Sequence, residues 1–481
     1  MNPNNTKHPQ IKERIEKKMR AGNVAAPAIT AFLGSVEKVI AGDSGMISES
    51  EIVPIESLPH FDKLSGGSQG EGGLLNQLAV IKLNGGLGTG MGLDRVKSLI
   101  RVKGDDTFLD FIARQILHLR EAGNAPNLAF YLMNSFGTQE DTLNYLSKYP
   151  NLASEGELDF LQSKVPKLHA ETLEPISWSA EPELEWCPPG HGDIYPSLLG
   201  GGLLDRLLAR GVKYLFVSNA DNLGATVDAK LLHYFAGSGF SFMMEVAERT
   251  GADRKGGHLA RRRSDGRLLL RESAQTQKAD EAAFQDIDRH RYFNTNNLWI
   301  RLDRLQEEMN RRGGALPLAL ITNRKTVDPR DATSPNVLQL ECAMGAAIEC
   351  FEKTGAIVVP RSRFAPVKTT SDLLTLRSDA YRVTKDFRIE LEPSRQGQPP
   401  LVDLDAKFFK LLADFESRLP DGAPSLIGCE SLVVTGNIAF ARDVIFRGNV
   451  EISNDSPDRR IVPKGIYEGV VLTLGESSTI L

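Results

Sequence analysis

The chain has 481 residues, of which 41% are hydrophobic and 25% are charged, and its net charge is −5. This composition is typical of a globular protein, and the length predicts two or three domains. The negative net charge argues against a protein whose whole surface binds nucleic acid. No apolar run is long enough to span a bilayer, so we expect no membrane partner. Four scattered cysteines without a C-x-x-C pair favour a reducing cytoplasm.

Two kinds of apolar pattern alternate along most of the chain. Residues 9–41 show helical spacing, and the Gly- and Ser-rich stretch 62–73 predicts a linker. Beyond it, expected strands alternate with expected helices. The strands are 78–83, 127–133, 212–218, 240–246 and 355–359, and the helices are Phe108–Ala122, Leu198–Arg210 and Val337–Lys353. This alternation predicts an α/β fold with a mostly parallel, doubly wound sheet.

The pattern changes after the proline-containing stretch 393–400. A short helix is expected at Lys407–Arg418, and an aliphatic residue then recurs at every sixth position, at Leu426, Leu432, Ile438, Val444 and Val450. Such a repeat predicts a parallel β-helix, although an antiparallel meander would also fit the aliphatic positions. The expected organisation is therefore an N-terminal helical segment with its linker (1–74), an α/β domain (75–392) and a C-terminal β-helix domain (393–481).

A glycine-rich stretch, AVIKLNGGLGTGMG at residues 79–92, follows the first strand after the expected linker. Glycine lets backbone N–H groups approach an anion or a base closely. The dinucleotide fingerprint fails because Leu93 stands in place of its third glycine, and the P-loop fails because Val96 precedes Lys97. A tight turn without a ligand is the alternative, but so many glycines favour a ligand loop with Lys97 near a phosphate.

A second strand, within YLFVSNADNLGATVD, ends at Asn219 and Asp221. Ligands of open α/β sheets bind at the carboxyl ends of strands, which suits a carboxylate that binds Mg²⁺. Either residue could instead cap a helix. In VKTTSD, Lys368 stands among small hydroxyl residues, either as a second phosphate-binding cation or as a solvated lysine.

Two further motifs carry polar residues that suit a sugar or a phosphate. PPGHGDIY holds His191 between two glycines, where it can donate a hydrogen bond, although a lone histidine is more often a packing residue. YFNTNNLWI places Asn294 and Asn296 on one face of a strand, unless they simply form a polar edge. The chain shows no Ser–His–Asp spacing, cysteine nucleophile or zinc cluster. Together these residues predict phosphoryl or nucleotidyl transfer by positioning and charge neutralisation.

Seven motifs closely resemble those of the eukaryotic-type UTP–glucose-1-phosphate uridylyltransferase (UDP-glucose pyrophosphorylase) family. They run in family order from about residue 75 to 375 and read KLNGGLGTGMG with KS, LMNSFGTQEDT, PPGHGDIY, FVSNADNLGATVD, KGGHLARR, FNTNNLWI and VPRSRFAPVKTTSDLL. The resemblance implies a Rossmann-like nucleotidyltransferase core at residues 75–392. It also implies that the C-terminal β-helix is left-handed.

The resemblance further implies an enzyme that makes UDP-glucose and pyrophosphate from UTP and α-D-glucose 1-phosphate with Mg²⁺. Nucleotide contacts are expected from Leu83, Asn84, Gly85, Gly86, Met133, Gln162, Gly190 and Asn219. Sugar-phosphate contacts are expected from His191, Glu245, Gly257, Asn294 and Asn296. The expected catalytic residues are Asp221, which would bind Mg²⁺, and the phosphate-binding Lys97 and Lys368.

The chain departs from the family in the segment before Lys97. It reads Leu93-Asp94-Arg95-Val96 where the family has a short stretch with proline and glycine, so an acid stands near the phosphates. We expect Arg95 to compensate for Asp94, and the change to affect rate and metal affinity rather than the reaction.

Three alternatives stay open at the level of sequence. One is a pyrophosphorylase for another sugar 1-phosphate, such as N-acetylglucosamine or galactose. The second is a glycosyltransferase, which would want an Asp-x-Asp motif where this chain has Asn219. The third is a non-catalytic nucleotide-sugar binding protein. A homo-oligomer formed through the β-helix, with contacts from 473–481, is possible, as is a monomer.

Overall fold

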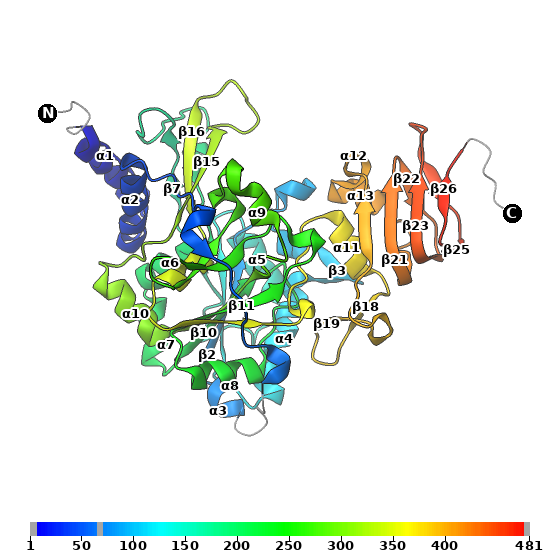
Figure 1. Ribbon diagram of the computed structural model, residues 1–481, viewed down its shortest axis with the longest axis horizontal. Helices are drawn as coiled ribbons and strands as arrows, with labels where there is room; N and C mark the ends of the chain where they lie inside the picture. The colour runs from blue at the N-terminus through cyan, green and yellow to red at the C-terminus, as the bar shows by residue number, and fades with distance from the viewer. Residues whose placement is uncertain (1–6, 65–70, 476–481) are drawn as a thin grey trace.

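The computed structural model describes residues 7–64 and 71–475 (Figure 1). A pair of N-terminal helices, a large α/β body and a narrower C-terminal stack of strands follow one another along its long axis. None of the helices in the described ranges is long and apolar enough to cross a membrane. Of the linker expected at 62–73, residues 65–70 lie outside the described residues, and α3 (Glu71–Leu75) begins just after them.

The α/β body is built on a ten-stranded sheet. Its main path runs β1-β12-β14-β10-β2-β5-β6, with β11 joined to β14, β17 joined to β11, and β13 joined to β12. The strands are β1 (Ile52–Val53), β2 (Leu78–Asn84), β5 (Ala129–Asn134), β6 (Asp159–Leu161), β10 (Tyr214–Asn219), β11 (Phe242–Glu248), β12 (His258–Arg262), β13 (Leu268–Arg271), β14 (Tyr292–Arg301) and β17 (Thr354–Val358). All five strands expected from the sequence are present within two residues of their expected bounds.

The sheet is mixed, which corrects the expectation of a mostly parallel one. Strands β10, β2, β5 and β6 are parallel neighbours, as are β11 and β17. Five of the nine pairings are antiparallel, and each of these involves β12 or β14. Strands β12 and β13 are joined by residues 263–267 alone, whereas two 3₁₀ segments and the short helix α9 (Glu281–Gln285) lie between β13 and β14. A connection as short as 263–267 allows only an antiparallel pair.

Both faces of the sheet are covered, as strand β2 shows. Its residues Leu78 and Val80 belong to one buried cluster, and Ala79 and Ile81 to another. The first cluster includes residues of α4 (Phe108–Ala122) and α8 (Ala229–Ser238), and the second includes residues of α6 (Ile194–Gly200), α7 (Leu203–Ala209) and α10 (Leu302–Arg311). The single helix expected at Leu198–Arg210 is therefore two, because the chain turns at Gly202, whose φ is +69°.

A smaller unit packs against the N-terminal helices α1 (Lys7–Ala21) and α2 (Ala26–Ile40), which confirm the expected helices at 9–41. It contains the three-stranded sheet of β15 (Leu320–Thr326), β16 (Asn336–Cys342) and β8 (Leu168–His169), and the pair β7 (Val165–Pro166) and β9 (Trp186–Cys187).

The prediction of a helix at Val337–Lys353 is wrong. Its first part is strand β16 and its second a 3₁₀ segment, Met344–Glu349. Val337 is buried in one cluster and Leu338 in another, so this apolar run is a strand covered on both faces. Periodicity alone does not distinguish such a strand from a buried helix.

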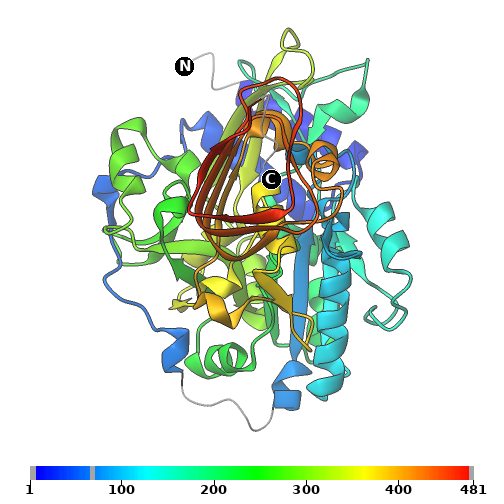
Figure 2. The same ribbon diagram turned by 90° about the vertical axis from the view of Figure 1, so that its right-hand side faces the viewer.

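The C-terminal part consists of parallel strands. They are β20 (Leu401–Leu404), β21 (Ser425–Thr435), β22 (Ile438–Phe440), β23 (Val444–Ser453), β24 (Arg460–Val462), β25 (Gly465–Glu468) and β26 (Val471–Thr473). All their pairings are parallel, and the five aliphatic residues at hexapeptide spacing are at most 1% exposed. An antiparallel meander is excluded. Seen end-on, successive strands overlie one another (Figure 2).

Short elements complete the chain. The helix expected at Lys407–Arg418 is split into α12 (Ala406–Phe409) and α13 (Leu412–Ser417). The others are α5 (Gln139–Leu146), α11 (Thr370–Arg377), and the strand pairs β3 (Arg101–Lys103) with β4 (Asp106–Thr107) and β18 (Tyr381–Val383) with β19 (Ile389–Leu391).

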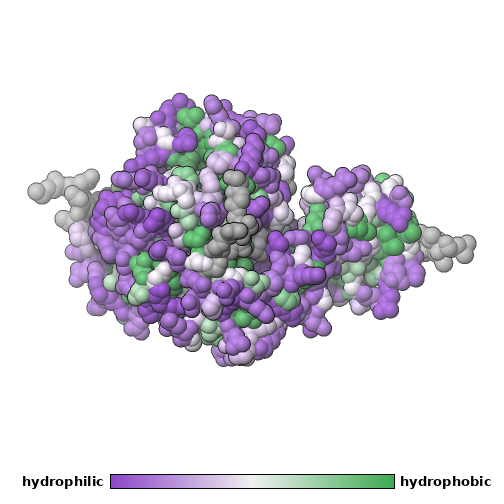
Figure 3. Space-filling view, turned by 90° about the horizontal axis from the view of Figure 1, so that it is seen from below, coloured by the Kyte–Doolittle hydropathy of each residue, from purple (hydrophilic) through white to green (hydrophobic). Residues whose placement is uncertain are grey.

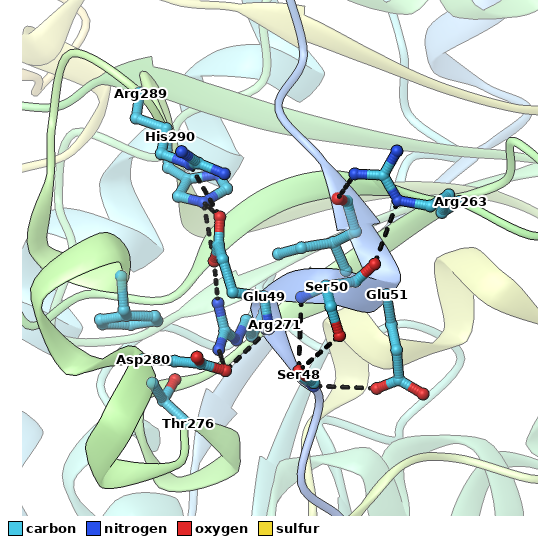
Figure 4. Close-up of polar contacts among 12 residues, drawn as sticks. Ser48, Glu49, Ser50, Glu51, Arg263, Arg271, Thr276, Asp280, Arg289 and His290 are labelled. Atoms are coloured by element: carbon cyan, nitrogen blue, oxygen red, sulfur yellow. Dashed lines mark hydrogen bonds and ion pairs between the residues drawn. The ribbon is translucent and has the colours of Figure 1, made fainter.

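Residues 48–53 fasten the N-terminal segment to the β12–β13 hairpin (Figure 4). The Glu49 carboxylate accepts hydrogen bonds from Arg271 Nη1 at 2.6 Å and Arg289 Nε at 2.8 Å, and it lies 3.0 Å from His290 Nε2. The Arg271 side chain is fully buried. Arg271 Nη2 also donates to Asp280 Oδ2 at 3.2 Å, so two carboxylates compensate this buried charge, which would cost several kcal/mol if it were unpaired.

Two buried histidines lie beside this contact. The rings of His258 and His290 stack with centroids 3.8 Å apart. Burial lowers the pKa of both, and the neighbouring Arg271 acts in the same direction. Arg249 also lowers the pKa of His258, whereas Glu49 partly opposes the shift at His290. The folded protein therefore favours two neutral rings.

These lowered pKa values predict an acid-sensitive fold. Above the unfolded pKa of about 6.5 both states hold neutral rings, whereas below it the unfolded chain binds protons first and stability falls. We expect His258→Leu to reduce this loss by up to about 1.4 kcal/mol per pH unit. Urea unfolding between about pH 5 and 8 measures it. His233→Leu, at an exposed position of α8, is the control; equal slopes in both variants would contradict the prediction.

Candidate active site

The carboxyl ends of β2, β5 and β10 meet at one edge of the sheet. In the register, Asn84 pairs with Asn134 and Leu83 with Asn219. The Asn84 amide donates to Asn134 Oδ1 at 2.8 Å and to Thr142 Oγ1 at 2.9 Å, while its Oδ1 accepts from Ser98 at 2.5 Å. The buried side chain of Asn84 therefore holds the start of the glycine loop in place.

The glycine loop begins against Gln162, another of the expected nucleotide contacts. A Cβ atom on Gly85 would lie 2.9 Å from Gln162 Oε1, whereas one on Gly86 would meet nothing within 4 Å. Gln162 is itself fixed by a hydrogen bond from its N–H to Asn134 O at 2.8 Å. Met133 is buried beneath them, in the same cluster as Leu83. The structure thus brings together the expected residues of β2, β5 and the Gln162 segment.

The rest of the loop folds back on itself before Lys97. Leu87 and Val96 form an antiparallel bridge, and Gly88 N donates to Arg95 O at 3.2 Å. Asp94 and Arg95 are both exposed, and none of the ion pairs found among the described residues joins them. Compensation of Asp94 by Arg95 stays a prediction.

Lys97 and Asp221 form an ion pair across the edge of the sheet. Lys97 Nζ lies 2.6 Å from Asp221 Oδ2, and the two side chains are 20% and 22% exposed. Asp221 follows β10 directly, two residues after Asn219, which is partly exposed at the same edge. A cation and a carboxylate thus face solvent beside the glycine loop.

The residue before Lys368, Val367, holds Lys368 near this edge of the sheet. Val367 N donates to Asp221 O at 3.2 Å. Lys368 itself is exposed and lies just before α11, where its N–H donates to Asp372 Oδ2 at 2.8 Å. The structure therefore joins the three expected catalytic residues around the loop that follows β10.

Residues of β12 and β14 form a second polar group. Asn294 N donates to Gly257 O at 3.0 Å, and Asn294 Nδ2 donates to Asn296 Oδ1 at 2.8 Å. Asn296 has a φ of +59°, a left-handed conformation that asparagine tolerates, at a bulge in β14. A Cβ on Gly257 would lie 2.3 Å from Glu272 Oε2, so the Glu272 carboxylate packs against this backbone.

Glu272 was not expected from the sequence. Burial raises its pKa, and Asn294 and Lys368 partly oppose the shift. This carboxylate thus interacts with the Asn294 amide and with the positive charge of Lys368. An acid directly after an apolar strand, as in LLLRE, is the only signal in the sequence that could have found it.

His191 is held as a neutral hydrogen-bond donor. Met344 N donates to His191 Nδ1 at 3.0 Å, which leaves the ring proton on Nε2. Burial lowers the pKa of His191 to about 4. The preceding Gly190 has a φ of +82°, and a Cβ there would lie 2.5 Å from Cys342 O. This loop is therefore fixed by backbone contacts with the end of β16.

Glu245 lies inside the body rather than at its surface. Its side chain is 0% exposed, and Arg363 donates to both carboxylate oxygens at 2.8 Å. Asn297 Nδ2 at 3.0 Å and Trp299 Nε1 at 2.8 Å complete its contacts. All its acceptor positions are used by protein donors, so this arrangement leaves none for a sugar.

Lys82 is a second residue that the sequence reading missed. It lies within β2, where its Nζ donates to Ser218 Oγ at 2.8 Å and to Ala225 O at 2.6 Å. Burial lowers the pKa of Lys82 to about 7, and Arg363 acts in the same direction. A lysine inside the apolar run AVIKLN was the available signal.

A cavity of about 720 Å³ lies elsewhere, between α2 and the segment 189–196. Mostly apolar residues line it, among them Phe32, Leu316 and Leu340. It borders the His191 loop from behind, at Gly192, but contains none of the expected site residues. We assign it to packing between the N-terminal helices and the body.

Comparison with known proteins decides the family. The family model described as UTP–glucose-1-phosphate uridylyltransferase matches residues 29–447. The chain is 43% identical over 405 residues to the UTP–glucose-1-phosphate uridylyltransferase of Saccharomyces cerevisiae, and 42% identical over 402 residues to the probable one of Schizosaccharomyces pombe. Each alignment covers 83% of this chain and 78% of the relative. The chain belongs to the UTP–glucose-1-phosphate uridylyltransferase family.

Solved structures of this family have the same fold. A variant of the Leishmania major UDP-glucose pyrophosphorylase in complex with UDP-glucose matches with a TM-score of 0.92 at 46% identity, covering 97% of this chain and 99% of that one. The Trypanosoma brucei protein matches with a TM-score of 0.89 at 46% identity, covering 97% and 100%. The resemblance seen in the sequence is confirmed.

The residues at the sheet edge fit a metal ion that arrives with a phosphate ligand. Among the described residues no group of three or more His, Cys, Asp or Glu side chains could hold a metal alone. Asp221 offers one partly exposed hard oxygen donor. Mg²⁺ in phosphoryl-transfer sites commonly takes one or two carboxylates, with phosphate oxygens and water. One partly exposed carboxylate beside the glycine loop meets the protein's share of that requirement.

The His191 loop provides a test of this geometry. Because the Gly190 backbone is left-handed and lies against Cys342, we expect Gly190→Ala to lower the free energy of unfolding by more than about 1 kcal/mol. Gly86→Ala, with open space at its Cβ, is expected to change it by less than about 0.5 kcal/mol. Urea denaturation measures both, and equal effects would show that the loop relaxes.

Proposed function

We propose that this enzyme transfers a uridylyl group from UTP to α-D-glucose 1-phosphate and releases pyrophosphate. One observation supports this most strongly. In a chain of this family, the glycine loop, the Lys97–Asp221 pair and the Lys368 segment meet at one sheet edge. This arrangement provides two cations and exposed backbone for a reaction between two polyanions.

The reaction is an in-line displacement at the α-phosphorus of UTP. A phosphate oxygen of glucose 1-phosphate forms a bond to that phosphorus. The bond from phosphorus to the bridging oxygen breaks, and pyrophosphate leaves with the electron pair. A sugar phosphate is ionised near neutral pH, so no general base is required. The neutral His191, with its pKa of about 4, fits a hydrogen-bond donor rather than a base.

Lys97 and Lys368 are the proposed phosphate ligands. Two polyanions repel each other strongly, and fixed cations in a site with little water reduce that repulsion without moving during the reaction. Asp221 is the proposed Mg²⁺ ligand, and a bound Mg²⁺ would neutralise phosphate charge. Lys97 is paired with Asp221 here, so nucleotide phosphates would compete for the lysine.

The two sides of the site have different proposed ligands. Leu83, Gly85, Gly86 and Gln162 would contact the nucleotide, with Asn84 and Met133 supporting the loop and with Gly190 and Asn219 at its rim. His191, Gly257, Asn294 and Asn296 would contact the sugar phosphate, and we add Glu272 because it packs between them and Lys368. Glu245 is not proposed as a sugar contact, because protein donors occupy its carboxylate.

The C-terminal part is proposed to be a left-handed parallel β-helix. Parallel pairing and buried aliphatics at every sixth residue support this assignment. We retain the division into segments 1–74, 75–392 and 393–481 as a proposal. The last strands expose Ile461, Ile466 and Val471, and hydrophobic residues reach the surface of this lobe (Figure 3). These residues support the β-helix as the contact of a homo-oligomer.

The four free cysteines support the proposal that the enzyme is located in a reducing compartment such as the cytoplasm. Three of them are buried, and burial raises the pKa of each of these three thiols, to about 12 for Cys187 and Cys350.

Pyrophosphate release with UTP and Mg²⁺ tests the proposed function. We expect release with glucose 1-phosphate and little with galactose 1-phosphate or N-acetylglucosamine 1-phosphate. Lys368→Ala is expected to lower kcat/KM at least about a hundredfold, because it removes a transition-state cation. Lys230→Ala, an exposed lysine on α8, is the matched control. Pyrophosphate release only with another sugar 1-phosphate would mean that the enzyme uses that sugar in place of glucose. Release with none of the three would overturn the proposed activity.

Gly85 and Gln162 allow a second test, of the base site. A Cβ on Gly85 displaces the Gln162 amide, so we expect Gly85→Ala to weaken UTP binding roughly tenfold, about 1.4 kcal/mol. In a Gln162→Ala background the same substitution should cost less than about twofold. Titration calorimetry measures all four proteins. A full effect in both backgrounds would contradict an effect that acts through Gln162, and would leave the contact of Gly85 with the nucleotide as its only source.

A further inference from the structure

A buried network of charged and polar groups underlies the phosphate side of the proposed site. Its centre is the Glu245–Arg363 ion pair, whose side chains are 0% and 9% exposed. Arg363 donates to the carboxylate through Nε and Nη2, both at 2.8 Å. Two parallel hydrogen bonds fix the direction of the guanidinium as well as its distance.

Arg363 joins three segments that are distant in sequence. Glu245 belongs to β11, in the middle of the central sheet. Arg363 Nη2 also donates to Thr226 O at 2.8 Å, in the chain that follows β10. Arg363 itself ends the 3₁₀ turn Arg361–Arg363, five residues before Lys368. One guanidinium therefore fixes the loop of Asp221 and the segment of Lys368 to the same strand.

Asn222 adds a tether between the last two segments. Its Nδ2 donates to Arg363 O at 3.1 Å, and its Oδ1 accepts from Ala365 N at 3.0 Å. Asn222 also forms a bridge with Pro366, next to the hydrogen bond from Val367 N to Asp221 O. The segment at Asp221 and Asn222 thus runs beside the segment from Arg363 to Val367.

Close packing confirms how little freedom this junction has. A Cβ on Gly224 would lie 2.2 Å from Ser362 O, so only glycine fits there. From the other side, Lys82 Nζ holds Ser218 and Ala225 O, at the two ends of the Asp221 loop. The loop is fixed from both sides.

We propose that Arg363, oriented by Glu245, is a positioning residue that sets the place of Lys368 relative to Asp221 and Lys97. Neither Arg363 nor Glu245 needs to touch substrate for this role. The inference rests on the proposed function, because it assigns Lys368 to the phosphates. It also gives Glu245 a role that its burial permits, in place of sugar contact.

A double-mutant cycle with Lys368 tests the positioning role. Arg363→Lys keeps the charge but cannot form the paired hydrogen bonds. We expect it to lower kcat on the order of tenfold to a hundredfold, because small displacements of catalytic groups have effects of that size. In a Lys368→Ala background the same change should lower kcat by less than about twofold. A purely structural role would lower kcat by the same factor in both backgrounds, which would overturn the inference.

Two matched variants complete the experiment. Arg114→Lys breaks another paired arginine–carboxylate contact, with Asp106 at 2.6 and 2.9 Å, away from the site, and should leave kcat unchanged. If Arg363→Lys fails to fold, Asn222→Ala removes the tether without leaving a buried charge. It should show the same loss of effect when Lys368 is absent, and an additive effect would overturn the inference.

Binding measurements separate this inference from the proposed function. The double-mutant cycle of Arg363 and Lys368 can also be measured on UTP affinity by calorimetry, which requires no turnover. An active wild-type enzyme with additive effects would overturn only the positioning role. A wild-type chain that turns over no sugar phosphate, yet shows the coupling in UTP binding, would overturn the activity and support the positioning role.

Discussion

A carboxylate with no exposed surface, Glu245, must find a cation inside the protein, and the rest of the site depends on how it does so. Its partner Arg363 lies on the segment that leads to Lys368. Because an unpaired buried charge is strongly unfavourable, the pair forms only when β11, the Asp221 loop and the Lys368 segment are all in place. The same requirement that stabilises the interior therefore brings the Asp221 loop and the Lys368 segment together at the sheet edge.

The glycine-loop side of the site follows from a different constraint, the parallel arrangement of β10, β2 and β5. Parallel strands bring their carboxyl ends to one edge, so three asparagines that end these strands gather there. One of them, Asn84, uses both amide hydrogens and its side-chain oxygen to hold the start of the glycine loop. The glycines then leave the backbone accessible, and Gly85 fits only because it lacks a Cβ beside Gln162. The polar group around Asn294 rests on the antiparallel strands β12 and β14, and the N-terminal segment is fastened to this part of the sheet through Glu49 and Arg271.

Sequence reasoning succeeded where a signal was local. Strand and helix periods, the glycine loop and the hexapeptide aliphatics each lie within a short stretch, so all five strands and the parallel C-terminal stack could be predicted. It failed at Val337–Lys353, where an apolar run buried on both faces carries no distinguishing period. It also predicted a more parallel sheet than the structure has, because neither β12 nor β13 was among the strands expected from the sequence. Lys82 and Glu272 were missed because a single charged residue within or next to a strand looks the same in the sequence whether it is buried or solvated.

The sequence by itself determined the family, the α/β alternation and the set of expected site residues, because these depend on residue type and spacing along the chain. Only the tertiary structure decided which of them face one another. The contact of Lys97 with Asp221 joins residues far apart in sequence, and its geometry is set by strand register. The burial of Glu245 and the neutral state of His191 were likewise undecided until the surrounding elements were placed. Solvent exclusion is a property of the packed fold, and it determines whether a charged side chain binds a ligand or holds the site together.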